Sequence, residues 1–113
     1  LLTEKHMYWL FMVGAILFEV VGTVSLKLSE GFTQYLYVGI TVVGYVTSFA
    51  LLGMALKGLP VSVVYAIWSG AGTALVAMIG IVILGEEANV MKVASIGLVI
   101  IGVIGISLAD KAS

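Results

Sequence analysis

The sequence contains no cysteine, no arginine, a single proline and a single histidine. Without cysteine there are no disulfide bonds and no thiol chemistry, and cysteine usage says nothing of the redox compartment. His6 lies outside the apolar runs, so neither a histidine metal site nor a catalytic triad has the residues it needs inside the protein. Charged residues make up only 10% of the chain, with a net charge of −1 and no basic cluster. This argues against a nucleic-acid partner.

Apolar residues take the place of the missing charge. They make up 62% of the 113 residues, and the mean hydropathy is +1.25. Soluble domains carry about a quarter charged residues, and a chain this short buries only about 60–70% of its unfolded surface. Lipid must therefore cover the remaining apolar surface, and we expect an integral membrane protein.

Four apolar runs are long enough to cross a bilayer as helices, which takes about 20 residues each. A barrel strand would need only about 10 residues, with strict alternation of apolar and polar side chains, so we expect an all-α protein. Polar turns separate the runs, and Pro60 suits the first turn of the third helix. The predicted spans are 7–28, 35–56, 61–84 and 90–109.

The two ends of the chain are treated separately from this single four-helix domain of residues 7–109. Residues 1–6 are expected to be a short leader, natural or artificial, and residues 110–113 a C-terminal tail. The apolar run that starts at Met7 is too long for the core of a signal peptide, which spans about 7–15 residues.

Lysines are balanced between the two sides of the predicted bundle. Lys5, Lys57 and Lys111 fall on the side of the N-terminus, and Lys27 and Lys92 fall on the other. If the leader is artificial, two lysines stand against two, and orientation in a membrane depends on an imbalance in such counts. We expect dual topology with antiparallel pairing of two copies; insertion in one orientation on a small bias is the alternative.

Glu19 is the one acidic residue within an apolar run. It lies about 12 residues into the first span, near the middle of the membrane, where an acid costs about 2.5–3.5 kcal/mol. Desolvation favours its neutral form, and once deprotonated it attracts a cation. A group that holds either a proton or a cation meets the minimum requirement for exchange. Alternatively Glu19 stays protonated and bonds another helix, or it pairs with Lys27 of another chain, since within one helix the two are about 12 Å apart.

Small and aromatic residues share the predicted helix faces around this acid. Aromatic ring faces bind soft cations at roughly 0.5–2 kcal/mol per contact, so the expected ligands are hydrophobic organic cations and protons. Plain packing or an interfacial aromatic belt is the alternative for each ring. The candidate site residues are Ala15, Gly22 and Thr23 on the first span, Tyr45 and Phe49 on the second, and Tyr65, Trp68 and Ser69 on the third.

Glycines and other small residues mark two further features. Gly70 and Gly72 lower the rigidity of the third helix and are a candidate hinge, with close helix packing as the alternative. Apart from Lys92 near its start, the fourth span has neither charge nor aromatic residue, and its small residues Ser95 and Gly102 are seven apart. We expect that face to be a dimer contact, because one chain is too small to enclose a pathway. We expect no cofactor.

Two segments give the chain a resemblance to the small multidrug resistance family of bacterial transporters. They are GAILFEVVGTVSLKLSEGF, residues 14–32, and LPVSVVYAIWSGAG, residues 59–72. The resemblance implies an antiparallel homodimer in the bacterial inner membrane, with Glu19 of both subunits forming a shared proton and substrate site. It also implies substrate contacts by the aromatic residues, bending at Gly70–Gly72 and dimer contact by the fourth helix.

Features of both main branches of that family occur in the chain. Gly22, Thr23 and the Trp68-Ser69-Gly70 element resemble the quaternary-ammonium and multidrug branch, whereas Phe18 resembles the guanidinium-exporting branch. We therefore expect a proton-coupled antiporter of hydrophobic organic cations. A guanidinium or polyamine exporter is the alternative cargo, and a rotor-type or assembly subunit with a buried acid is the alternative without transport. The apolar spans hold no nucleophile or metal ligands for an enzyme.

Overall fold

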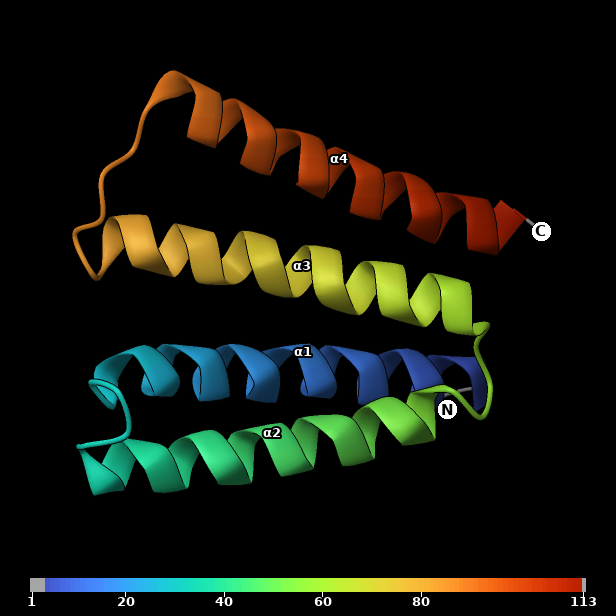
Figure 1. Ribbon diagram of the computed structural model, residues 1–113. Coiled ribbons are helices and arrows are strands. Elements are labelled where there is room, and N and C mark those ends of the chain that lie inside the picture. Colours follow the sequence, from blue (N-terminus) through green and yellow to red (C-terminus); the bar gives the residue numbers. More distant parts are fainter. Residues whose placement is uncertain (1–3, 113) are drawn as a thin grey trace.

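The computed structural model describes residues 4–112, which form four α-helices and no strand. This confirms the expected four-helix membrane protein, because each helix is long and apolar enough to cross a bilayer. Consecutive helices run antiparallel (Figure 1). The helices are α1 (Glu4–Leu28), α2 (Tyr35–Ala55), α3 (Val61–Val82) and α4 (Val90–Ala112).

The helix ends differ from the predicted spans at several points. α1 begins at Glu4, inside the segment expected as a leader. α4 continues through Ala112 instead of ending at 109, because no glycine or proline follows Gly105 to stop it. Whether residues 1–6 are a leader stays a prediction, and residues 1–3 lie outside the described part of the chain.

Proline and glycine set the two ends of α3. Pro60 is the N-cap, with φ −62° and ψ 143°, so it lies directly before the helix and not within its first turn. The helix ends at Val82, two residues before the expected 84. Gly85 there adopts a left-handed φ of 72°, and the Glu86 N–H donates to the Gly80 carbonyl at 2.9 Å. This reversal closes the helix end.

The α1–α2 connection is organised by the buried Ser29. Its carbonyl accepts hydrogen bonds from the N–H groups of Thr33 and Gln34, both at 2.9 Å. Glu30, Gly31 and Phe32 are all left-handed, with φ of 51°, 70° and 69°. The connection is therefore a tight reversal that places α2 directly beside α1.

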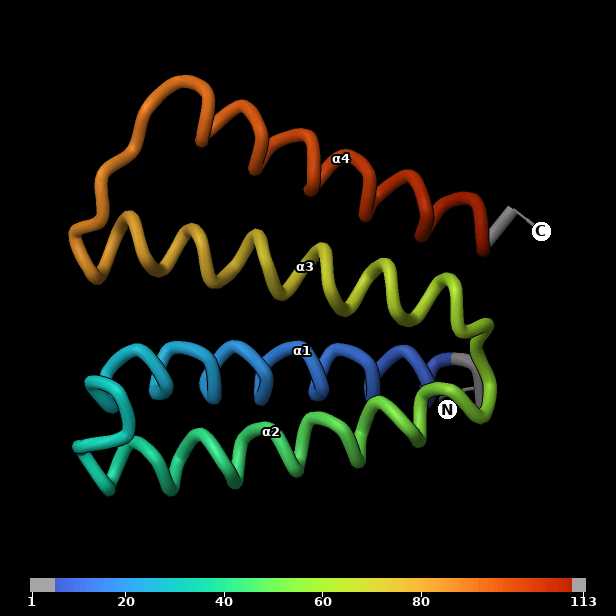
Figure 2. Tube along the Cα trace, viewed as in Figure 1, coloured from blue at the N-terminus to red at the C-terminus, as the bar shows by residue number. Residues whose placement is uncertain are grey.

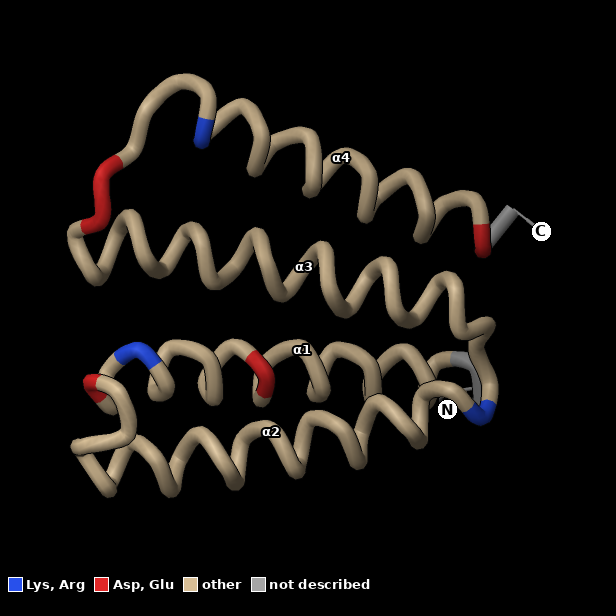
Figure 3. The backbone as a smooth tube through the Cα atoms, in the orientation of Figure 1, with Lys and Arg blue, Asp and Glu red and all other residues tan. Residues whose placement is uncertain are grey.

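The helices lie in the spatial order α2, α1, α3, α4, so that α1 is flanked by α2 and α3 while α4 packs along α3 (Figures 1 and 2). The helical bundle measures 44 × 35 × 23 Å. Both ends of the chain lie at the same end of the bundle, as four crossings require (Figure 2). Charged residues gather at its two ends, apart from one acid midway along α1 (Figure 3).

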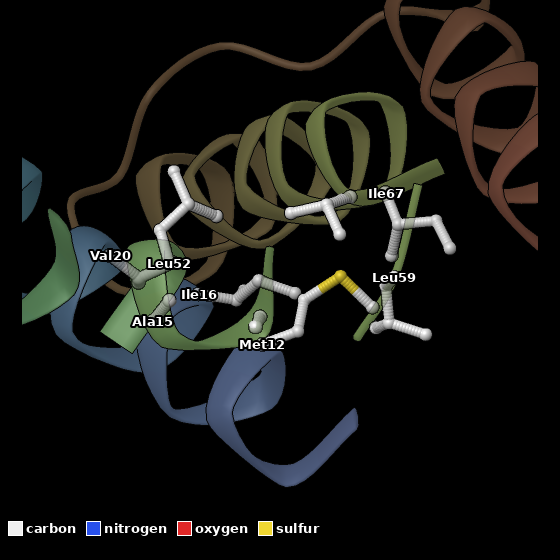
Figure 4. Close-up of a cluster of buried hydrophobic side chains, with 9 residues drawn as sticks. Met12, Ala15, Ile16, Val20, Leu52, Leu59 and Ile67 are labelled. Carbon is white, nitrogen blue, oxygen red and sulfur yellow. The ribbon is translucent and has the colours of Figure 1, made fainter. Parts of the chain in front are cut away.

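The buried core joins α1, α2 and α3 and includes no α4 residue among the described ones (Figure 4). Outside the core, large apolar side chains point outward on every helix, such as Leu10, Val46 and Ile101 at 55%, 65% and 66% exposure. Exposure on this scale fits lipid as the surrounding medium. The core residues are Met12, Ala15, Ile16, Val20, Leu52, Ala55, Leu59, Val64 and Ile67.

Candidate functional site

Glu19 lies on the central helix α1 and is partly buried between its neighbours. Its Oε1 accepts a hydrogen bond of 2.9 Å from Thr23 Oγ1, one turn further along α1. Thr23 Oγ1 also lies 2.7 Å from the Tyr45 hydroxyl of α2. A threonine hydroxyl has one proton, which here goes to Glu19, so Tyr45 donates to Thr23. An ordered chain of hydroxyls therefore runs from α2 to one carboxyl oxygen.

The other carboxyl oxygen, Oε2, points toward α3. It is buried and has no hydrogen-bond partner within residues 4–112. A Cβ placed on Gly72 would lie 2.7 Å from Oε2, so the absence of a side chain at Gly72 provides the room for the carboxyl. A buried acceptor without a partner costs about 1–3 kcal/mol, and native proteins retain few of them. The lone pairs of this oxygen are therefore available to a proton or a cation.

Glycines bring α1 and α2 together beside the acid. A Cβ on Gly22 would lie 2.7 Å from Tyr45 Cδ1, so the Tyr45 ring occupies the space of a side chain at Gly22. A Cβ on Gly44 would lie 3.2 Å from Gly22 Cα and 3.0 Å from the Phe18 carbonyl oxygen. The hydroxyl of Tyr45 reaches Thr23 because Gly22 lets the ring lie against α1.

Three aromatic rings form a continuous row across α2 and α3. The Trp68 ring centroid lies 5.8 Å from that of Phe49 and 5.8 Å from that of Tyr65, with tilted planes in both pairs. Phe49 and Tyr65 are exposed, at 59% and 62%, while Trp68 is partly buried. The aromatic residues predicted on separate helices thus come together with Trp68 at the centre.

Two of the predicted site residues bond elsewhere. Ser69 Oγ donates to the Tyr65 carbonyl at 2.7 Å, within its own helix. Ala15 is fully buried, and its carbonyl accepts a 2.6 Å hydrogen bond from Ser48 Oγ of α2. Ala15 therefore forms part of the packed α1–α2 contact. Ser48 was not predicted as a site residue. Its three-residue spacing from Tyr45 puts both on one face of α2, and this spacing is the sequence signal for its contact with α1.

At Gly70 and Gly72 of α3, neighbouring side chains occupy the space that a larger residue would need. A Cβ on Gly70 would lie 2.6 Å from Val103 Cγ2 of α4, and Gly72 faces Glu19. α3 is a continuous helix through both residues. Close packing, the alternative to a hinge, therefore has direct structural support, and the hinge stays a prediction.

Much of the surface of α4 is open. An added Cβ on Gly102 meets nothing within 4 Å, and Ser95 is exposed with its hydroxyl bonded to the Met91 carbonyl at 2.7 Å. In the described chain, none of the most apolar stretch of α4 is buried. Ser95 also lines a pocket together with Thr73 and Ala77 of α3, so it lies toward α3. The dimer contact expected at Ser95 and Gly102 stays a prediction.

No metal site accompanies the acid within residues 4–112, where no three His, Cys, Asp or Glu side chains come together as possible ligands. The arrangement instead offers a carboxyl with one oxygen held by Thr23, a second oxygen without a partner, and a row of rings across α2 and α3. A carboxyl of this kind can hold either a proton or a cation.

Known proteins share this sequence over nearly its whole length. The profile of the Small Multidrug Resistance protein family matches residues 7–99. The chain is 46% identical over 103 residues to the guanidinium exporter of Escherichia coli K12, covering 91% of this chain and 98% of that protein. It is 39% identical over 105 residues to the quaternary ammonium compound-resistance protein QacE of Escherichia coli, covering 93% and 96%. It is also 46% identical over 104 residues to the uncharacterized membrane protein YvaE of Bacillus subtilis, covering 92% and 87%.

Proposed function

Since this chain belongs to the Small Multidrug Resistance family of membrane transporters, we propose that it exports hydrophobic organic cations in exchange for protons. It is a multi-pass protein of the bacterial inner membrane and not an enzyme. The observation that carries the proposal is the Glu19 carboxyl, which has one oxygen held by Thr23 and the other buried without a partner in the described chain.

Exchange follows from the two states of this one group. A protonated Glu19 is neutral and offers no charge to a cation, whereas a deprotonated Glu19 in a poorly solvated site attracts one strongly. Proton and cation therefore compete for the same oxygen. If the carboxyl faces the two sides of the membrane in turn, a proton entering from one side drives the cation out on the other.

The proposed unit is an antiparallel homodimer with a site shared by both copies of Glu19. A single chain leaves α4 unburied on its outer face and leaves the exposed rings of Phe49 and Tyr65 on the surface. The balance of lysines between the two ends of the bundle supports insertion in both orientations. Ser95 and Gly102 would then lie at the contact between subunits.

The contact between Gly22 and Tyr45 favours a bulky cation. A larger residue at Gly22 would displace the Tyr45 ring and separate its hydroxyl from Thr23. With glycine there, an aromatic ring stands beside the acid, as a large apolar cation requires. The second candidate cargo is guanidinium, which the name and 46% identity of the Escherichia coli exporter favour. Phe18, directly before the acid, supports the same alternative.

The test is uptake by proteoliposomes with an acidic lumen and tetraphenylphosphonium outside. Antiport predicts uptake that requires the pH gradient and disappears with Glu19→Gln, which keeps the size of the side chain but removes its charge. Glu87→Gln makes the same change in an exposed loop and should leave uptake intact. Binding of tetraphenylphosphonium should also weaken as the pH falls, because protons compete for the carboxyl.

Guanidinium uptake under the same conditions separates the two cargoes. Transport of guanidinium without tetraphenylphosphonium would replace the proposed cargo and leave the exchange mechanism in place. Failure of the native protein to move either cation would overturn the proposed function.

A further inference from the structure

The indole of Trp68 carries a second buried polar atom without a partner. Its Nε1 is inaccessible to solvent and makes no hydrogen bond within residues 4–112. The ring centroids of Phe49 and Tyr65 each lie 5.8 Å from that of the indole. A buried N–H group without an acceptor is destabilising, because it has lost its hydrogen bond to water. A tryptophan whose N–H is buried usually has a partner, so this donor points to an acceptor supplied from elsewhere.

Trp68 and the free oxygen of Glu19 face the same side of α3. Gly72, which lies against Glu19 Oε2, follows Trp68 by four residues. Residues four apart share a helix face and are about 6 Å apart along the axis. The position that carries the unpaired donor, Trp68, and the position that lies against the unpaired acceptor, Gly72, are therefore about one helical turn apart on α3.

The cations considered so far satisfy only one of these two atoms. A quaternary ammonium has no lone pair to accept a hydrogen bond, and guanidinium has donors only. Either would neutralise Glu19 and leave the Trp68 N–H buried without an acceptor. A ligand that satisfies both atoms carries a cationic centre and, a few bonds away, a carbonyl or similar oxygen.

We propose that Trp68 is a specificity-determining residue whose indole N–H selects organic cations bearing a hydrogen-bond acceptor, with acylated quaternary ammonium compounds as the class that fits. The cationic nitrogen lies at Glu19 Oε2, and the acyl oxygen accepts from Trp68 Nε1. This inference rests on the proposed function, since it concerns cargo bound at Glu19.

The test compares two cations of equal chain length by competition against tetraphenylphosphonium in lipid bilayers. Acetylcholine carries the acceptor, and pentyltrimethylammonium replaces its ester with methylene groups. The N–H is removed by Trp68→Phe and, without change of shape, by 3-benzothienylalanine at position 68, whose sulfur replaces the N–H. A neutral hydrogen bond is worth about 0.5–1.5 kcal/mol, so the preference for acetylcholine should fall about two- to twelvefold in both variants.

Taking the ratio of two ligands cancels the loss of ring area and any general damage to the site. Trp9→Phe removes the other indole N–H of the chain and should leave the ratio unchanged. An equal loss of affinity for both cations would overturn the inference, because the N–H would then serve the protein itself, for example an acceptor on the second subunit. Failure of the proposed function has a different result. Pentyltrimethylammonium would then bind equally well to the native protein and to Glu19→Gln.

Discussion

At the scale of single residues, the site depends on the space left by glycine. Gly22→Ala places a Cβ 2.7 Å from Tyr45 Cδ1, so the ring must move and its hydroxyl must leave Thr23. Inserting such bulk into a packed contact costs about 1–3 kcal/mol. We expect the affinity for tetraphenylphosphonium, measured by equilibrium binding, to fall about tenfold. Gly39→Ala is the matched control, because a Cβ there meets nothing within 4 Å. Equal affinity in the two variants would contradict the role of Gly22.

The sequence identifies the acid but not its surroundings. Glu19 stands out because it is the one acid in an apolar run, and Thr23 follows from the four-residue spacing within one helix. The contact of Glu19 Oε2 with Gly72, and of Tyr45 with Thr23, depends on how α1 crosses its neighbours. Crossing angles and axial offsets depend on side-chain packing along whole helices, so one sequence does not determine them.

At the scale of the helices, Gly70 distinguishes packing from bending in α3. A Cβ on Gly70 would lie 2.6 Å from Val103 Cγ2, so Gly70→Ala should slow pH-driven uptake by pushing α4 away. If packing is the cause, Val103→Ala in the same chain restores the space, and uptake should recover by at least half. If bending is the cause, Gly70→Ala makes α3 more rigid, and Val103→Ala on α4 does not reverse this. The double variant should then transport as slowly as Gly70→Ala alone.

The open face of α4 provides a second test at this scale. A Cβ added at Gly102 meets nothing within 4 Å in the single chain, so we expect the Gly102→Leu subunit to fold normally. Across a close helix–helix contact between subunits, the added side chain would separate the two backbones. We expect chemical cross-linking in the membrane to show mainly monomer. Gly53→Leu, at an equally open position on α2, should leave the dimer intact. A dimer that survives Gly102→Leu places the contact elsewhere.

Helix number and type are predictable here, whereas helix ends are less so. A long apolar run predicts a span by length alone, and all four spans appear in the structure. The ends depend on local signals. Pro60 marks the start of α3 and Gly85 follows its end, whereas no glycine or proline ends α4 before Ala112. α1 starts at Glu4, before the apolar run that begins at Met7, because a membrane-spanning helix can extend beyond the bilayer into water.

At the scale of the whole molecule, the balance of charge between its ends decides how it inserts. The C-terminus lies at one end of the bundle and the α3–α4 connection at the other (Figures 1 and 3). The chain has no cysteine, so single cysteines introduced by Ser113→Cys, outside the described residues, and by Glu87→Cys report on the two ends separately. Dual topology predicts that a membrane-impermeant maleimide labels part of each variant on intact cells, and the rest only after permeabilisation.

A change of one charge shows whether lysine balance is the cause. In a chain made without residues 1–6, which include Lys5, two lysines at one end (Lys57 and Lys111) stand against two at the other (Lys27 and Lys92). In that chain Lys57→Gln leaves one lysine against two. The end with more lysines stays in the cytoplasm. External labelling of Ser113→Cys should therefore rise and that of Glu87→Cys should fall, and transport should drop as antiparallel partners become scarce. Labelling confined to one of the two positions in the unaltered background would show a single orientation, and the antiparallel dimer would be wrong.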